Sequence, residues 1–274
     1  MQDKIIAVLK IIEQKHNVEI LYACESGSRA WGFDSKDSDY DIRFVYVRKT
    51  KDYLTVFPNE QLHIDHNNSK VCKDFLKHEL DFVGWDAKKV FYQFSKGNPD
   101  MISWFFSPIV YKFSKRALIT FKQLGSQFFK QKAAYYHYMH MAQKNYNQYI
   151  KNPELETVKV KKYLYVLRPL LACMWIELYR TEPPMIFEKI YSDATINKKL
   201  TKEMVYFLII ELIYEKRHGI ELGERPRMKD LDTFCEKYIQ YYSTLAGNIN
   251  VKELIENSYQ NLDKSFRNLV SLYN

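Results

Sequence analysis

The spacing of apolar residues changes along the chain, from a mixture of two periods in the first part to a helical period in the rest. In the first part, short runs rich in Val, Ile, Tyr and Phe predict strands, which cover residues 18–23, 39–47, 61–65 and 79–84. Apolar residues at intervals of three and four predict helices, over residues 4–14, 87–95 and 100–106. A short helix capped by Ser26 or Ser28 is expected to end at Gly32, and Asp86 is typical of an N-cap for the helix that follows it.

From about Ser114 onward the helical period dominates. The expected helices cover residues 117–129, 132–150, 156–179, 198–217, 230–244 and 251–272, with Pro and Gly residues between them. The sequence therefore predicts an α+β protein, with an α/β domain over residues 1–112 and an all-helical domain over residues 113–274.

Two features bear on where such a protein works. No window approaches the roughly 20 consecutive apolar residues of a membrane-spanning helix, so we expect a soluble protein with no membrane partner. The four cysteines lie far apart and form no C-x-x-C motif, which is typical of reduced thiols in the cytoplasm.

The positive charge of the chain is concentrated in one segment. The whole chain carries 41 Lys and Arg against 33 Asp and Glu, whereas residues 110–165 alone carry 11 Lys and Arg against two Glu, a local net charge of +9. Five tyrosines are interleaved with these lysines: Tyr135, Tyr136, Tyr138, Tyr146 and Tyr149. Aromatic rings beside cations are typical of single-stranded nucleic-acid binding, although tyrosines at helical spacing also pack inside helical domains. The segment predicts RNA as a partner and leaves the packing alternative open.

A pair of aspartates at the start of the second expected strand offers a candidate metal site. Residues i and i+2 of a strand point to the same face, about 6.5 Å apart, so Asp39 and Asp41 can hold the same cations. Magnesium prefers carboxylate oxygens, water and substrate phosphate. A two-metal site also needs a carboxylate from a neighbouring strand, for which Asp81 is the first candidate, Glu79 the second and Asp65 the third.

A glycine turn before the aspartate pair offers the other half of a phosphate-handling site. Gly27 and Ser28 can present backbone N–H groups and a hydroxyl to phosphate oxygens, and Arg29 or Arg43 can neutralise the phosphate charge. An EF-hand loop starting at Asp37 is excluded, because its sixth position is not Gly and its twelfth is not Glu. A Walker P-loop is excluded because the chain has no Gly-Lys-Ser or Gly-Lys-Thr.

The pattern Gly27-Ser28-x10-Asp39-Tyr-Asp41 resembles the signature of the DNA polymerase β-like nucleotidyltransferase superfamily. Longer strings resemble one branch, the YcgL-type or RNA repair pathway polymerase-β-like family; they are ESGSRAWGFDSKDSDYDIRFVYV, DFVGWDAKKVFYQFSKGNP, SPIVY and KKYLYVLRPLLACMW. The resemblance implies a small mixed sheet, with Asp39, Asp41 and Asp81 as catalytic metal ligands and Gly27-Ser28 as the triphosphate loop. It also singles out Lys162, Tyr165 and Arg168 of the helical half for nucleotide binding.

The expected activity is transfer of a nucleoside monophosphate from an NTP to an acceptor hydroxyl, with pyrophosphate release. Two Mg²⁺ ions, or Mn²⁺ in their place, are the expected cofactors. The expected acceptor is the 3′ end of an RNA, tRNA or another. The same chemistry on a protein or a small molecule, and a non-catalytic RNA- or nucleotide-binding module, remain as alternatives.

Overall fold

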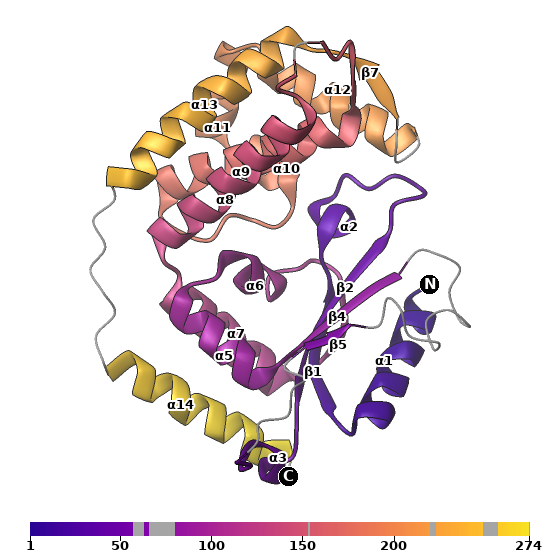
Figure 1. The fold of residues 1–274 in the computed structure, drawn as a ribbon, viewed down its shortest axis with the longest axis vertical. Coiled ribbons are helices and arrows are strands. Elements are labelled where there is room, and N and C mark those ends of the chain that lie inside the picture. The colour runs from indigo at the N-terminus through magenta and orange to yellow at the C-terminus, as the bar shows by residue number, and fades with distance from the viewer. Residues whose placement is uncertain (57–62, 66–79, 153, 220–222, 249–256, 274) are drawn as a thin grey trace. The chain divides into compact units, whose positions relative to one another are not determined.

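The computed structural model describes residues 1–56, 63–65, 80–152, 154–219, 223–248 and 257–273. The chain divides into two compact units. Unit 1 comprises Met1–Ala30, Asp39–Phe129 and Lys252–Asn274, and unit 2 comprises Trp31–Ser38 and Lys130–Val251. The α+β class expected from the sequence is confirmed (Figure 1). No helix within the described ranges is both long enough and apolar enough to span a bilayer.

Unit 1 is built on a five-stranded mixed sheet with the strand order β3-β4-β2-β1-β5. The strands are β1 (Glu19–Glu25), β2 (Tyr40–Val47), β3 (His63–Asp65), β4 (Leu80–Asp86) and β5 (Val110–Phe113). Strands β2 and β4 are parallel, whereas β1 is antiparallel to both β2 and β5, and β3 is antiparallel to β4. The parallel pair lies in the middle of the sheet and carries the acidic residues of interest.

Helices cover both faces of this sheet (Figure 1). Helix α1 (Gln2–His16) packs its buried residues against alternate residues of β2, namely Ile42, Phe44 and Tyr46. The intervening residues Val45 and Val47 pack in the other layer, with α5 (Ala87–Lys96), α6 (Pro99–Trp104), α7 (Lys115–Phe128) and α14 (Asn257–Val270). Because side chains alternate along a strand, Asp41 and Arg43 project from the same face as Val45.

The first helix of this second layer begins as the sequence predicts. The carboxylate of Asp86 accepts a hydrogen bond from the Lys88 backbone N–H at 2.8 Å, which is an N-cap. The buried Asp86 carboxylate also pairs with Arg48 at 3.3 Å and accepts a hydrogen bond from the Tyr53 hydroxyl at 3.0 Å. Helix α5 therefore starts from a fixed point at the end of β4.

The end of unit 1 differs from the expected boundary at residue 112, which falls inside β5. Strand β5 was not predicted, because its four residues, Val-Tyr-Lys-Phe, are too few to show an alternation of apolar and polar positions. It pairs with β1, and α7 packs in the same core as β1, so both remain in unit 1.

Unit 2 is mainly helical. Its helices are α8 (Gln131–Tyr149), α9 (Val160–Tyr179), α10 (Phe187–Tyr191), α11 (Ala194–Lys202), α12 (Val205–His218) and α13 (Lys229–Asn248). The two short strands β6 (Thr157–Lys159) and β7 (Glu224–Pro226) pair with each other, so the expectation that a helix begins at residue 156 was wrong. The expectation of one helix over residues 198–217 was also wrong, because Met204 adopts a left-handed conformation with φ of 59° and separates α11 from α12.

Residues 31–38 form part of unit 2 although they lie between β1 and β2 in sequence. The buried ammonium of Lys216 in α12 donates to the hydroxyls of Ser35 at 2.9 Å and Ser38 at 3.1 Å. The Ser38 hydroxyl in turn accepts a hydrogen bond from the Ser35 backbone N–H at 3.0 Å. The loop before the aspartate pair is therefore a packed part of the helical unit instead of a solvated turn.

Candidate active site

Two carboxylates lie side by side at the start of the parallel strand pair. In the β2–β4 register, Asp41 is the direct partner of Asp81. Both project from the face that carries α5, α6 and α7, because each lies an even number of residues from Val45 or Trp85, which pack in that layer. Their side chains are 30% and 32% exposed, so a ligand can reach them. The neighbouring-strand carboxylate predicted from the sequence is thus present at the expected place.

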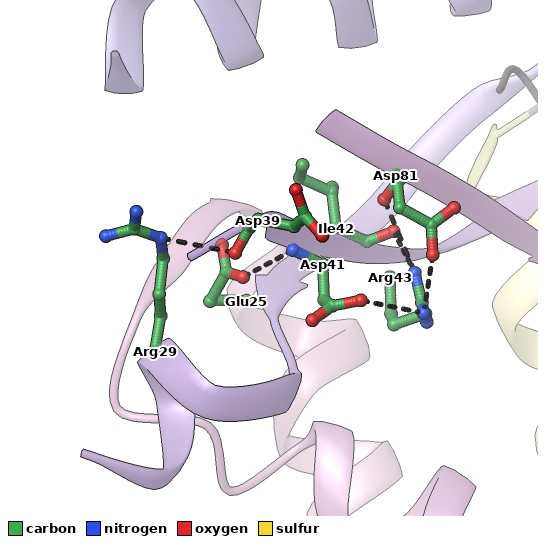
Figure 2. Close-up of polar contacts among 7 residues, drawn as sticks. All are labelled: Glu25, Arg29, Asp39, Asp41, Ile42, Arg43 and Asp81. Carbon is green, nitrogen blue, oxygen red and sulfur yellow. Dashed lines mark hydrogen bonds and ion pairs between the residues drawn. The ribbon is translucent and has the colours of Figure 1, made fainter. Parts of the chain in front are cut away.

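The strand end that carries Asp41 is fixed by the residues just before the glycine turn. The Asp41 backbone N–H donates to the Glu25 carboxylate at 2.6 Å, and the Asp41 carbonyl accepts a hydrogen bond from the Ser26 backbone N–H at 2.8 Å. The Tyr111 hydroxyl donates a short hydrogen bond to the second oxygen of Glu25. The backbone of Asp41 is therefore held on both of its polar groups, and Figure 2 shows the bond from its N–H to Glu25.

Gly27 brings the turn into contact with the Asp41 side chain. It adopts a φ of 63°, in the left-handed region that disfavours residues with a Cβ. A Cβ at this position would lie 2.0 Å from Asp41 Oδ2, which is a collision. Only glycine lets the backbone of the turn approach the carboxylate this closely, so the Gly–Ser turn and the aspartate strand form one site.

In Figure 2 the Arg29 side chain lies beside Asp39, whereas the Arg43 guanidinium lies between Asp41 and Asp81. The Arg43 guanidinium donates to Asp81 Oδ2 at 2.9 Å and to Asp41 Oδ1 at 3.3 Å. The Arg29 guanidinium stacks on the Tyr40 ring at 3.8 Å and donates from Nε to the Asp39 carbonyl at 3.3 Å. Arg43 thus neutralises the carboxylate pair, whereas Arg29 braces the entry to β2.

This chain is similar to known proteins over most of its length. The family model described as the RNA repair pathway DNA polymerase beta family matches residues 1–268. The chain is also 39% identical over 253 residues to the uncharacterized protein YcgL of Bacillus subtilis (strain 168), which covers 92% of this chain and 91% of that protein. This chain belongs to the RNA repair pathway DNA polymerase beta family.

Membership in this polymerase β family supports nucleotidyl transfer as the general activity and an association with RNA. It also extends the resemblance seen in the sequence, which was carried by strings between Tyr22 and Trp175, to almost the whole chain. The family description names no site residue, so the roles of individual side chains rest on the geometry alone.

The donor set of this polymerase β-family site fits magnesium. Asp41 and Asp81 supply hard oxygens in direct register, and Asp81 Oδ1 is buried without a hydrogen-bond partner from any described residue. Across the described part of the chain, no group of three or more His, Cys, Asp or Glu is gathered tightly enough to hold a metal ion. Magnesium needs no such cage, because it is usually bound by one or two carboxylates together with water and substrate phosphates.

The remaining acidic candidates differ in what can be said of them. Asp39 is exposed and lies two residues before Asp41, directly ahead of β2, as the motif requires. Asp65 lies in β3, where its backbone pairs with Val83. Glu79, the reserve for the third carboxylate, lies outside the described residues. Asp81 therefore remains the first choice for the third carboxylate.

Glu25 is a polar residue of the site that the sequence did not single out. Its side chain is fully buried, and burial raises its pKa from 4.5 to about 7 against the opposing effect of the hydrogen bonds from Tyr111 and the Asp41 N–H. The signal available in the sequence was a Glu at the end of an otherwise apolar strand, directly before the Gly–Ser turn. Glu25 therefore holds the backbone of Asp41.

The three residues predicted from the helical half cluster within unit 2. The Lys162 ammonium lies over the Tyr149 ring at 3.6 Å and over the Tyr165 ring at 5.5 Å. The rings of Tyr165 and Trp31 meet edge-on, with their centroids 5.8 Å apart. The Arg168 guanidinium stacks on the same Trp31 ring, 4.3 Å from its centroid. Arg168 is only 6% exposed, so it supports residues 31–38 from within the unit. Contact of these three residues with a nucleotide stays a prediction.

The tyrosines of the basic segment serve mainly as packing residues. Tyr135, Tyr138 and Tyr146 are buried, each at most 3% exposed. The hydroxyls of Tyr138 and Tyr146 donate to carboxylates within unit 2, those of Glu182 and Glu236. Three of the five tyrosines therefore present no ring face to a nucleic acid. The basic segment itself is divided between unit 1 and unit 2 at residue 129.

Proposed function

We propose that this protein is a metal-dependent nucleotidyltransferase that moves an NMP from an NTP to an acceptor hydroxyl, the 3′ end of an RNA. One observation carries the proposal. Asp41 and Asp81 are direct partners on adjacent parallel strands, and the turn at Gly27 lies against the Asp41 carboxylate. This arrangement joins a site for hard cations to a turn suited to phosphate oxygens.

The residues of the site have distinct roles in this proposal. Asp39, Asp41 and Asp81 hold two Mg²⁺ ions, which when bound stabilise phosphate charge and lower the pKa of the attacking hydroxyl. The turn formed by Gly27 and Ser28 orients the triphosphate. The acceptor oxygen forms a bond to the α-phosphorus, the bond from that phosphorus to the β-phosphate oxygen breaks, and the hydroxyl proton passes to solvent as pyrophosphate leaves.

RNA as the acceptor is supported by the family description and by charge. The description of the matching family names RNA repair. The net charge of +9 over residues 110–165 favours a polyanion and disfavours a small cationic acceptor. Lys162, Tyr165 and Arg29 supply the additional cations and ring that a nucleotide or an RNA end requires.

The experiment that tests the proposal is transfer of label from each of four α-³²P-labelled NTPs to RNA. We expect label in RNA with the wild-type protein in the presence of Mg²⁺ and loss of at least about 10³-fold with Asp41→Asn, because that carboxylate belongs to the reacting centre. Circular dichroism of the variant checks that it folds. Normal transfer by Asp41→Asn contradicts the assignment of this carboxylate to the reacting centre. Label that appears only in protein or in a small molecule contradicts the assignment of RNA ends as the acceptor.

A further inference from the structure

The Arg43 guanidinium sits between the two paired carboxylates of the candidate site (Figure 2). Besides its bonds to Asp81 Oδ2 and Asp41 Oδ1, it donates to the carbonyls of Asp81 at 3.3 Å and of Ile42 at 3.2 Å. Its side chain is 18% exposed, so these bonds are partly shielded from water. Four acceptors converge on one side chain, which therefore has a defined position.

The charge that Arg43 supplies is of the kind that a metal ion would supply. Asp41 and Asp81 are direct partners across the parallel strands, so their negative charges repel unless a cation lies between them. A guanidinium remains protonated at all ordinary pH values. It engages Asp41 Oδ1 and Asp81 Oδ2, so a cation already lies on both carboxylates. A divalent cation held by Asp41 and Asp81 would compete with this guanidinium for their negative charge.

The unused oxygen of Asp81 points to the same conclusion. Asp81 Oδ1 is buried and has no hydrogen-bond partner among the residues that the structure describes, which costs free energy. The arginine fork thus satisfies one oxygen of this carboxylate and leaves the other unsatisfied. A cation bound on this carboxylate can engage both.

We propose that Arg43 is an internal counter-cation that competes with divalent metal for Asp41 and Asp81, and that it moves to the substrate phosphates when metal and nucleotide bind together. The inference rests on the proposed function, because it takes the carboxylate pair as the metal site. Metal then binds weakly without a nucleotide and tightly with one, since only the nucleotide offers the displaced guanidinium a new anionic partner.

The opposite role for Arg43 makes the opposite prediction. If the guanidinium were a strut that holds the carboxylates in place for the metal, its removal would weaken metal binding. If it is a competitor, its removal strengthens metal binding. The sign of the change in metal affinity therefore decides between the two roles.

The test measures Mn²⁺ binding without nucleotide by electron paramagnetic resonance of the free ion, for the wild type, Arg43→Met and Arg43→Lys. Arg267→Met is the matched control, because it removes the same charge from an exposed guanidinium on α14 of the same unit instead of from the carboxylate pair. We expect Arg43→Met to bind Mn²⁺ at least about fivefold more tightly than the wild type, a typical coupling factor. Arg43→Lys, which lacks the planar fork, should show a smaller change of the same sign, and Arg267→Met a change of less than about twofold.

A second measurement uses an α,β-methylene NTP analogue with Mn²⁺, and here Arg43→Met should bind the analogue about tenfold more weakly than the wild type. Equal or weaker Mn²⁺ binding by Arg43→Met overturns the inference; if that variant does not fold, the same outcome with Arg43→Lys does so. Absence of Mn²⁺ binding by the wild type even with the analogue overturns the proposed function itself. Normal binding with the analogue but no effect of Arg43 overturns only the inference.

Discussion

The buried carboxyl of Glu25 should make the stability of this protein depend on pH in a way that one substitution removes. Its pKa is about 7 in the folded protein, against 4.5 for an ordinary glutamate, because burial disfavours the charged form. Between these two values the folded state binds more protons than the unfolded state. The free energy of unfolding attributable to Glu25 is therefore fully present below pH 4.5 and is lost as the pH rises through 7.

The size of the effect follows from the two pKa values. A difference between 4.5 and about 7 corresponds to roughly 3 kcal/mol. Glu25→Gln keeps an acceptor for the Asp41 N–H but cannot ionise, so the variant lacks this component of the pH dependence. Going from pH 4.5 to pH 8, the wild type should therefore lose about 3 kcal/mol of stability relative to Glu25→Gln.

Urea unfolding followed by circular dichroism at pH 5, 6, 7 and 8 measures this difference. Glu154→Gln, which neutralises an exposed carboxylate of unit 2, controls for the loss of one negative charge. The refuting result is a constant difference between wild type and Glu25→Gln across this pH range, which would mean that Glu25 is ionised at an ordinary pKa in the folded protein.

Two further predictions concern the glycine turn and the tyrosines. Gly27→Ala should lower the free energy of unfolding by about 1–2 kcal/mol through the left-handed backbone alone. The added Cβ should also displace Asp41 and abolish label transfer. The control Gly247→Ala lies at a position with open space in α13 and should be neutral or slightly stabilising by thermal unfolding. Tyr146→Phe should cost about 1 kcal/mol through the lost hydroxyl bond and leave affinity for a fluorescent single-stranded RNA unchanged; a marked fall in that affinity would show that this ring contacts RNA.

Much of the fold could be predicted because local sequence and tertiary packing agree in most elements. The strand over residues 39–47, the N-cap at Asp86 and the helices over residues 132–150 and 230–244 all have strong local signals, and each is present. The elements that were missed have weak local signals and depend on distant partners. Strand β5 exists through its pairing with β1, and β6 exists through its pairing with β7 far along the chain.

The candidate site shows the same division. The motif spacing predicted the Asp39–Asp41 pair, and the strand-like pattern around Asp81 made it the first candidate for the third carboxylate. The β2–β4 register places Asp41 opposite Asp81. The spacing could not show that Arg43 would lie on those carboxylates or that Glu25 would be buried beneath them. The place of Arg43 depends on which face of each strand the helices cover. The burial of Glu25 also depends on the hydroxyl of Tyr111, a residue 86 positions away in sequence.

The assignment of residues 31–38 to the helical unit has a consequence for the modularity of this protein. The chain passes from one unit to the other four times, since α14 also returns to unit 1 after the helices of unit 2. No single cut separates the units: a fragment ending at residue 129 lacks α14, and a fragment beginning at residue 130 lacks the segment that Lys216 binds. Gene fusion, truncation or domain exchange must therefore preserve both units together, and the two halves are expected to be inherited as one piece.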